Sequence, residues 1–454
     1  MADLLGLSAR IIDSGVADEP VNRITQELSE VADGVAVVES FSHSIAFSTD
    51  DGLLVFDASG SATGGRVVES LRRWTPDPIH TIVYTHGHLD HVGGSPAFLA
   101  DAQDRGFARP SFVGQAGVVD RMARYRLTDG WNRLINERQF GWVPNTDLRI
   151  GAGQSSSMES MESMQGVSSG GGLFGDRFLP DDVAQPDVTY SDVLALQVGG
   201  IEVQLRHGKG ETDDHTWAWI PRFKAICCGD FLIWNFPNAG NPQKVQRYPA
   251  EWAASLRAMA ALEPELLLPA HGLPIGGAER IQSVLLDVAT VLEDLVSRTV
   301  SMMNAGATLD EIVHTVRVPD EILARPYLRP LYDEPEFVVR NIWRLYGGWW
   351  DANPARLKPA PDADLAQEVA SIAGSAAALA KRSEELAAAG RLDLACQLAE
   401  WAGQADPDDP SVHAARARVY MQRYKSESSL MAKGIFASAA RESEAKAQHR
   451  LPAG

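Results

Sequence analysis

The chain has 454 residues, of which 45% are hydrophobic, and a formal net charge of -19 at pH 7. This length predicts two or three domains with a sizeable core. The acidic balance argues against a nucleic-acid partner and against anionic membranes, and no run approaches the roughly 20 apolar residues of a membrane span.

The beginning of the chain gives no sign of a secretory signal, because no basic region precedes a long apolar run. The three cysteines, Cys227, Cys228 and Cys396, are too unevenly spaced for a disulfide framework or a zinc knuckle. They are typical of small buried residues in a reducing compartment. We therefore expect a cytoplasmic protein.

The first predicted elements form a meander of strands and one helix. Residues 1–30 are expected to be an extension made of a helix and a loop. The apolar and alternating segments 35–40, 44–48 and 53–57 predict strands joined by short turns. Residues 64–74 carry apolar side chains at helical spacing and predict a helix.

A cluster of potential metal ligands follows the buried strand predicted at residues 81–84. The sequence there reads Thr-His-Gly-His-Leu-Asp-His-Val-Gly-Gly, and its ligand-type residues are His86, His88, Asp90 and His91. Imidazole nitrogens and carboxylate oxygens suit a borderline cation such as zinc. The spacing predicts that His86 and His88 share one metal, while Asp90 and His91, pointing elsewhere, hold a second.

This stretch resembles the His-x-His-x-Asp-His signature of the metallo-β-lactamase superfamily. The resemblance implies an α/β protein with the αβ/βα four-layer sandwich of that superfamily. It also implies a metal site at one edge of the sheets, and the rest of the chain can be searched for the residues that complete it.

The middle of the chain combines helices, a biased segment and a hairpin. Residues 95–149 are predicted to be mostly helical, with a strand at 112–114. Residues 151–175 are rich in serine, glycine and methionine and predict a mobile loop, because this composition cannot build a packed core. It is either a disordered insertion or a lid whose methionines contact a lipid-like substrate. Residues 194–205 predict a hairpin around two glycines.

Three later residues are predicted to complete the metal site. Asp230 and His271 each follow an apolar strand, in the order that the superfamily resemblance implies, with Asp230 as the bridging carboxylate. The superfamily pattern also has a histidine in a Gly-His-Thr-Pro-Gly turn, and Glu211 stands at its place here. His207 and His215 flank it, and His215 is the alternative ligand or a support for one.

The C-terminal part is predicted to be helical from residue 281. It begins with apolar residues at helical spacing in 281–297, continues through an aromatic-rich joint and ends in alanine-rich helical hairpins. The joint and hairpins resemble the dimerisation domain of class III alkyl sulfatases, which hydrolyse sulfate esters of long-chain alcohols. The resemblance implies a homodimer, and a glutamate at the third-ligand position, as in that family, supports Glu211.

The chain departs from that family at the segment after Asp230. The family's bridging residue is usually a glutamate in an Ala-Glu-Asn context, and its His-Thr-x-His-Asn segment is replaced here by residues 236–248. We also expect the chain to lack the family's sterol-carrier-like C-terminal domain. Six side chains are candidates for substrate contact, with a solvated loop as the alternative for those of the 236–248 segment: Asn238, Asn241, Lys244, Arg247, Tyr248 and Tyr125.

The predicted function is hydrolysis of sulfate esters by a metal-bound hydroxide at a dinuclear centre containing Asp90 and Asp230. The cofactors are two divalent ions, with Zn²⁺ favoured over Mn²⁺ or Fe²⁺. The alternative is a hydrolase of the same fold that acts on another ester, a lactone, a thioester or an ether. The predicted domains are an extension (1–30), a catalytic domain (31–280), a helical dimerisation domain (281–445) and a tail (446–454).

Overall fold

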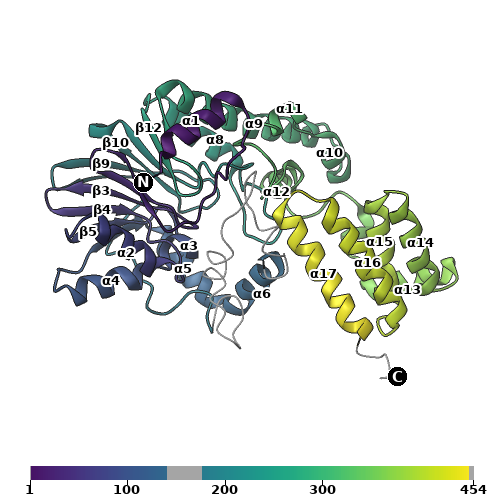
Figure 1. Cartoon of the computed structure of the whole chain (residues 1–454). Helices are drawn as coiled ribbons and strands as arrows, with labels where there is room; N and C mark the ends of the chain where they lie inside the picture. Colours follow the sequence, from purple (N-terminus) through teal and green to yellow (C-terminus); the bar gives the residue numbers. More distant parts are fainter. Residues whose placement is uncertain (1, 141–175, 449–454) are drawn as a thin grey trace. The chain divides into compact units, whose positions relative to one another are not determined.

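The computed structural model describes residues 2–140 and 176–448, which form two compact units (Figure 1). The loop predicted at residues 151–175 lies outside the described residues. The first unit contains the two sheets and most of the helices up to Gly348, and the second contains residues 135–140 and 308–310 together with the helices after Gly348. The domain limits predicted at residues 30, 280 and 445 stay predictions.

The first sheet contains seven strands in sequence order. Its first four strands pair antiparallel, and β4, β5, β6 and β7 pair parallel. The strands are β1 (Leu28–Ala32), β2 (Val35–Val38), β3 (Ser44–Thr49), β4 (Gly52–Phe56), β5 (Ile79–Val83), β6 (Ser111–Gln115) and β7 (Val188–Tyr190).

The second sheet contains six strands in the order β13-β12-β11-β10-β9-β8. The predicted hairpin is present as β8 and β9, and β11 pairs parallel with β12. The strands are β8 (Val193–Val198), β9 (Ile201–His207), β10 (Thr216–Ile220), β11 (Ala225–Gly229), β12 (Leu266–Pro269) and β13 (Ile275–Gly276).

Apolar side chains from both sheets meet in a common inner core. Phe47 and Phe56 of the first sheet share this core with Leu205 and Leu268 of the second. A separate core lies on the other face of the first sheet, where helices pack. The helices up to α6 are α1 (Leu4–Ser14), α2 (Gly64–Trp74), α3 (Leu89–Val92), α4 (Ser95–Asp104), α5 (Gly117–Leu127) and α6 (Asp129–Phe140).

Helices also cover the second sheet, so the layers are helix, sheet, sheet and helix, as predicted (Figure 1). Helix α8 packs on α9, and α9 contacts β12 and β13. The remaining helices of the first unit are α8 (Pro249–Ala260), α9 (Ala278–Asn304), α10 (Leu309–Thr315), α11 (Asp320–Leu323) and α12 (Pro335–Gly347). No helix in the described part of the chain is long and apolar enough to cross a membrane.

The second unit is built from antiparallel helices, which confirms the predicted all-α C-terminal region. Small residues such as Ala395 and Ala402 are fully buried, which lets the helix axes approach closely. The Ser375 side chain accepts a hydrogen bond from Ala378 N and caps the second helix. The helices are α13 (Asp362–Ala373), α14 (Ala376–Ala388), α15 (Leu392–Ala405), α16 (Pro410–Ser426) and α17 (Leu430–Gln448).

The fold brings the ends of four strands to one place. The histidine motif follows β5, which pairs parallel with β4, and Asp57 follows β4. In the other sheet Asp230 follows β11, which pairs parallel with β12, and His271 follows β12. Side chains at the ends of neighbouring parallel strands share one edge of a sheet, so these residues are positioned by rigid elements.

Candidate metal centre

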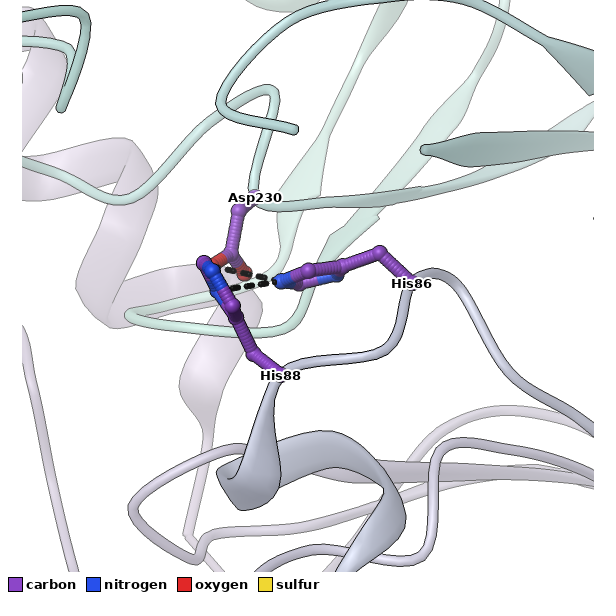
Figure 2. A group of neighbouring side chains, drawn as sticks. All are labelled: His86, His88 and Asp230. Carbon is purple, nitrogen blue, oxygen red and sulfur yellow. Dashed lines mark hydrogen bonds and ion pairs between the residues drawn. The ribbon is translucent and has the colours of Figure 1, made fainter. Parts of the chain in front are cut away.

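The first group of potential ligands consists of His86, His88 and Asp230 (Figure 2). The Nε2 atom of His86 lies 2.8 Å from the Nδ1 atom of His88 and 3.7 Å from the Oδ2 atom of Asp230. The His88 side chain comes from the residue that caps the start of α3, and Asp230 comes from the turn after β11. Two strand ends from different sheets therefore converge here.

The second group consists of Asp90, His91 and His271. The Oδ2 atom of Asp90 lies 3.5 Å from His91 Nε2 and 3.3 Å from His271 Nε2. Asp230 reaches this group too, because its Oδ2 atom is 3.5 Å from His91 Nε2 and its Oδ1 atom is 3.5 Å from His271 Nε2. The Asp230 carboxylate thus lies between the two groups.

The donor atoms of both groups suit a divalent cation. His91 Nε2 and Asp230 Oδ1 are buried and have no hydrogen-bond partner among the described residues. Buried polar atoms are nearly always paired, so unpaired atoms beside other ligand-type side chains are suited to binding a cation. Nitrogen and oxygen donors of this kind accept several first-row metals.

The charges of the side chains fit the same interpretation. Burial lowers the pKa of His86 well below its ordinary value, and neighbouring histidines lower it further, which favours the neutral form that binds metals. Burial opposes ionisation of Asp230, but His91 and His271 lower its pKa overall. Burial likewise opposes protonation of His91, yet the carboxylates around it raise its pKa well above the usual value. Such strong mutual interactions are typical of a functional site.

Glu211 and His215 play different parts in the structure. Glu211 is buried, and its Oε1 atom lies 3.7 Å from His88 Nδ1 at the edge of the first group. The Nε2 atom of His215 accepts a hydrogen bond of 3.1 Å from the backbone N–H of Asp230. The His215 ring lies between the rings of His86 and Phe231, at centroid distances of 4.4 and 4.5 Å.

His207 lies apart from these contacts, because its Nε2 atom is 2.8 Å from the backbone carbonyl oxygen of Asp213. Of the three residues weighed for the last ligand position, Glu211 therefore has an oxygen directed at the first group. His215 supports the backbone of Asp230 and the ring of His86. The assignment of Glu211 as a ligand stays a prediction.

Two of the predicted substrate contacts lie directly beside Glu211. The Nδ2 group of Asn238 donates a hydrogen bond to Glu211 Oε1, and an Arg247 terminal nitrogen lies 3.4 Å from the same oxygen. The Arg247 side chain is 2% exposed, and its Nε and second terminal nitrogen have no partner among the described residues. The Oδ1 atom of Asn238 is unpaired in the same sense. The two unpaired Arg247 nitrogens are buried donors and are suited to an anion.

The other predicted contacts are less directly connected to the two groups. Burial and the charge of Arg247 lower the pKa of Lys244 to about 7, although Glu211 and Asp90 oppose this change. Asn241 is buried in the same segment. Tyr248 has the Lys209 ammonium 5.2 Å from its ring centre, and the ring of Tyr125 packs edge-on against another aromatic ring of the outer core.

Two aspartates near the centre were missing from the sequence prediction. Asp57 Oδ2 lies 2.8 Å from His91 Nδ1, and the backbone N–H and hydroxyl of Thr85 both donate to the Asp57 carboxylate. Asp214 accepts hydrogen bonds from the backbone N–H of Gly87 and from Arg121, at 3.0 and 2.9 Å. The position of Asp57 at the end of a strand was the one available signal.

Family models match two parts of the chain. Residues 37–113 match the model described as "Metallo-beta-lactamase superfamily", and residues 308–446 match "Alkyl sulfatase dimerisation". A 145-residue stretch is also 31% identical to a hydroxyacylglutathione hydrolase of Acidiphilium cryptum, covering 32% of this chain and 55% of that protein.

Similar proteins extend over most of the chain. A linear primary-alkylsulfatase of Pseudomonas sp. is 27% identical over 82% of this chain and 68% of its own length. An (R)-specific secondary-alkylsulfatase of Pseudomonas sp is 24% identical over 84% of this chain and 57% of its own. The solved structure of a stereoselective inverting sec-alkylsulfatase from Pseudomonas sp. superposes with a TM-score of 0.76 at 22% identity.

That superposition covers 94% of this chain but 66% of the solved chain. This protein therefore spans about two thirds or less of the length of most of these relatives. The metallo-β-lactamase match covers the histidine motif at residues 86–91, and the alkyl sulfatase dimerisation match covers the helical region, in the expected order. The chain is an alkylsulfatase-like protein with the metallo-β-lactamase fold.

Proposed function

We propose that this protein is a metal-dependent hydrolase of sulfate esters, with alkyl sulfates as its substrate class. The observation that carries the proposal is the position of Arg247. Its buried guanidinium lies beside Glu211, at the edge of the metal-ligand groups, with two N–H-bearing nitrogens unpaired. A planar guanidinium can donate two parallel hydrogen bonds to a sulfate group, as it does to other oxyanions.

We infer that the centre holds two divalent ions, with zinc favoured and manganese or iron as alternatives. His86, His88 and Glu211 would hold the first, Asp90, His91 and His271 the second, and Asp230 would reach both. Ions bound there would lower the pKa of a coordinated water towards neutrality and polarise the ester. The ligand residues lie on strand ends and short turns, so little reorganisation is needed to receive the ions.

The side chains of this chain then divide into positioning and binding roles. Arg247 would hold the oxygens of the sulfate group, which is negatively charged before hydrolysis and more so after it. The Nδ2 group of Asn238, which donates one hydrogen to Glu211, would donate its other hydrogen to the same oxygens. Asp230 would orient the attacking water, because its carboxylate lies between the two groups. Lys244 would add positive charge at the same edge when it is protonated.

A second candidate is hydrolysis of another ester-type bond, a lactone, a thioester or an ether. The similarity of one third of the chain to a hydroxyacylglutathione hydrolase favours keeping this candidate. The same metal groups would serve both reactions, and the difference would lie in residues 236–248. The helical region that matches the alkyl sulfatase dimerisation model supports a homodimer.

The test is a substrate panel on purified protein of known metal content. The panel contains dodecyl sulfate, 2-octyl sulfate, p-nitrophenyl sulfate, p-nitrophenyl butyrate and a simple lactone. We expect inorganic sulfate to be released from the alkyl sulfates, and Asp230→Asn to abolish this release. Robust esterase or lactonase activity without sulfate release would overturn the proposal in favour of the second candidate.

The role of Arg247 is tested in the same assay. Arg247→Lys keeps the charge but loses the planar pair of donors, and we expect KM for dodecyl sulfate to rise about 10- to 100-fold. Arg257→Lys is the matched control, since Arg257 is a half-exposed surface arginine paired with Glu293. An equal KM in both variants would contradict the assignment of Arg247 as the anion-binding group.

A further inference from the structure

Residues 236–248, which include Asn238 and Arg247, form hydrogen bonds with a segment that lies far from them in the sequence. The backbone N–H of Phe236 donates to the carbonyl oxygen of Arg329 at 2.9 Å. The backbone N–H of Gly240 donates to Asp333 Oδ2 at 2.6 Å. Arg329 and Asp333 are both fixed in the loop before α12, about 90 residues further along the chain.

Helix α12 supplies two further contacts through Asn341. The Nδ2 group of Asn341 donates to the backbone carbonyl of Arg247 at 3.0 Å, and its Oδ1 atom accepts from the Arg247 backbone N–H at 3.2 Å. This reciprocal pair imitates the pairing of two strands and fixes the backbone from which the guanidinium extends. The Gln246 side chain also donates to Asn341 Oδ1, and Arg344 donates to Gln246.

These contacts lie in the interior of the first unit. Asn341 is 7% exposed, and Asp333 and Arg247 are 0% and 1% exposed. Asp333 also accepts a 2.7 Å hydrogen bond from the backbone N–H of Glu334 at the start of α12, so one carboxylate ties the helix to the loop. A Cβ atom at Gly240 would collide with the backbone of Phe337 and Val338, so the chain at Gly240 lies directly against α12.

We propose that Asn341 and Asp333 are positioning residues for the anion-binding group of the active site. They set where Asn238 and Arg247 stand relative to the metal-ligand groups, although neither touches the substrate. The inference rests on the proposed function, since it assumes that Arg247 holds a sulfate group. It assigns part of the region matched by the dimerisation model, residues 308–446, to substrate recognition.

The first test uses the unsubstituted protein. The backbone amides of Gly240 and Arg247 should exchange with deuterium slowly in the absence of sulfate, because their acceptors are side chains of the buried loop and of α12. Exchange as fast as in exposed loops would overturn the inference. This measurement needs neither activity nor a stable variant.

The second test compares Asn341→Leu with Ile342→Ala in the metal-loaded protein. Ile342 is fully buried on the same helix, so its truncation is the matched loss of packing. We expect Asn341→Leu to raise KM for dodecyl sulfate, and the dissociation constant of inorganic sulfate measured by calorimetry, at least tenfold. We expect kcat and metal content to change less than threefold.

The Ile342→Ala variant should lose stability without the change in KM. Equal KM and sulfate affinity in Asn341→Leu and the unsubstituted protein would overturn the inference while leaving the proposed function intact. Failure of the unsubstituted protein to release sulfate from any ester would instead remove the proposed function. The exchange data would then still report whether α12 holds this segment.

Discussion

The Nδ1 atom of His91 lies 2.8 Å from the Oδ2 atom of Asp57, and both side chains are fully buried. A carboxylate at this position holds the proton of His91 on Nδ1 and leaves Nε2 free to bind a metal. Ser42 and Thr85 hydroxyls approach the same nitrogen at 3.0 and 3.4 Å. The orientation of a central ligand is thus fixed by its surroundings before any ion binds.

We expect Asp57→Asn to weaken metal binding about 10- to 100-fold. The amide removes the charge that supports His91, and its NH₂ group would face either His91 or the N–H of Thr85. Metal affinity is measured by competition with a coloured chelator. Glu39→Gln is the control, because Glu39 is an equally buried carboxylate that pairs with Arg23 and Thr25. Equal metal affinity in Asp57→Asn and in this control would refute the role of Asp57.

Removing the metal is expected to lower the melting temperature by several degrees. A ligand that binds only the folded state at 100 times its dissociation constant adds about 2.7 kcal/mol to the free energy of unfolding. The Asp90 and Asp230 carboxylates, which share His91 and His271, would also repel each other without it. Melting curves with chelator, and after Zn²⁺ or Mn²⁺ is returned, measure the effect. The melting temperature of Asp230→Asn should change much less when the metal is removed. A change as large as in the unsubstituted protein would contradict the assignment of Asp230 as a metal ligand.

Acid is expected to destabilise the metal-free protein partly through His43. Burial lowers the pKa of His43 to about 4, while an unfolded histidine titrates near 6.5. Between these values the unfolded chain binds the extra proton, so stability is complete above about pH 6.5 and falls as the pH drops. This difference in pKa corresponds to a loss of about 3 kcal/mol in the free energy of unfolding by pH 4.

Urea unfolding between pH 4 and 7, with chelator present, compares the unsubstituted protein with His43→Gln. The glutamine keeps a neutral donor for the carbonyl of Gly272, 2.8 Å from His43 Nε2. Its stability should depend less steeply on pH, with every other histidine unchanged. If the free energy of unfolding falls equally with pH in both proteins, His43 is not a source of the acid sensitivity.

Gly229→Ala is expected to damage both stability and activity. Gly229 has a φ of +53° and directly precedes Asp230, and an added Cβ would lie 2.6 Å from His215 Nε2 and 2.8 Å from Thr85 Cβ. The left-handed conformation costs about 1–2 kcal/mol for alanine, and the crowding adds about 1–3 kcal/mol. The displaced Asp230 should lower kcat at least tenfold.

The matched control for this change is Gly15→Ala. Gly15 has a φ of +71°, but nothing lies within 4 Å of an added Cβ. Urea unfolding of Gly15→Ala should show only the loss of stability caused by the left-handed conformation. Its activity should equal that of the unsubstituted protein. Similar losses in both variants would mean that crowding near Asp230 has no effect.

The sequence predicted the parts of the structure that depend on short patterns. The apolar strands that precede His86, Asp230 and His271 are present, and the four-layer arrangement is the one that the superfamily resemblance implied. These strand ends bring the ligand-type residues within 4.8 Å in groups of three. A strand–turn pattern, together with the order that the superfamily resemblance implies, carries enough information for this part of the centre.

Contacts between distant segments could not be predicted in the same way. Asp57 approaches His91 because β4 and β5 are parallel neighbours, which the sequence of either strand does not state. Asn341 meets Arg247 across 94 residues, and nothing in the helical pattern of α12 distinguishes an asparagine that binds a backbone from one that faces water. Such residues become visible when the tertiary packing is known.

The hydrogen bonds between residues 236–247 and the segment formed by α12 and the loop before it also bear on the design of chimeras between relatives. A crossover at residue 308, where the second family match begins, would keep all the proposed metal ligands together but pair them with a foreign α12. Such a chimera would keep the residues that bind the ions, but it would lose the hydrogen bonds between the Arg247 backbone and the side chain of Asn341. Chimeras between relatives should therefore be joined after Gly348, where the first compact unit ends.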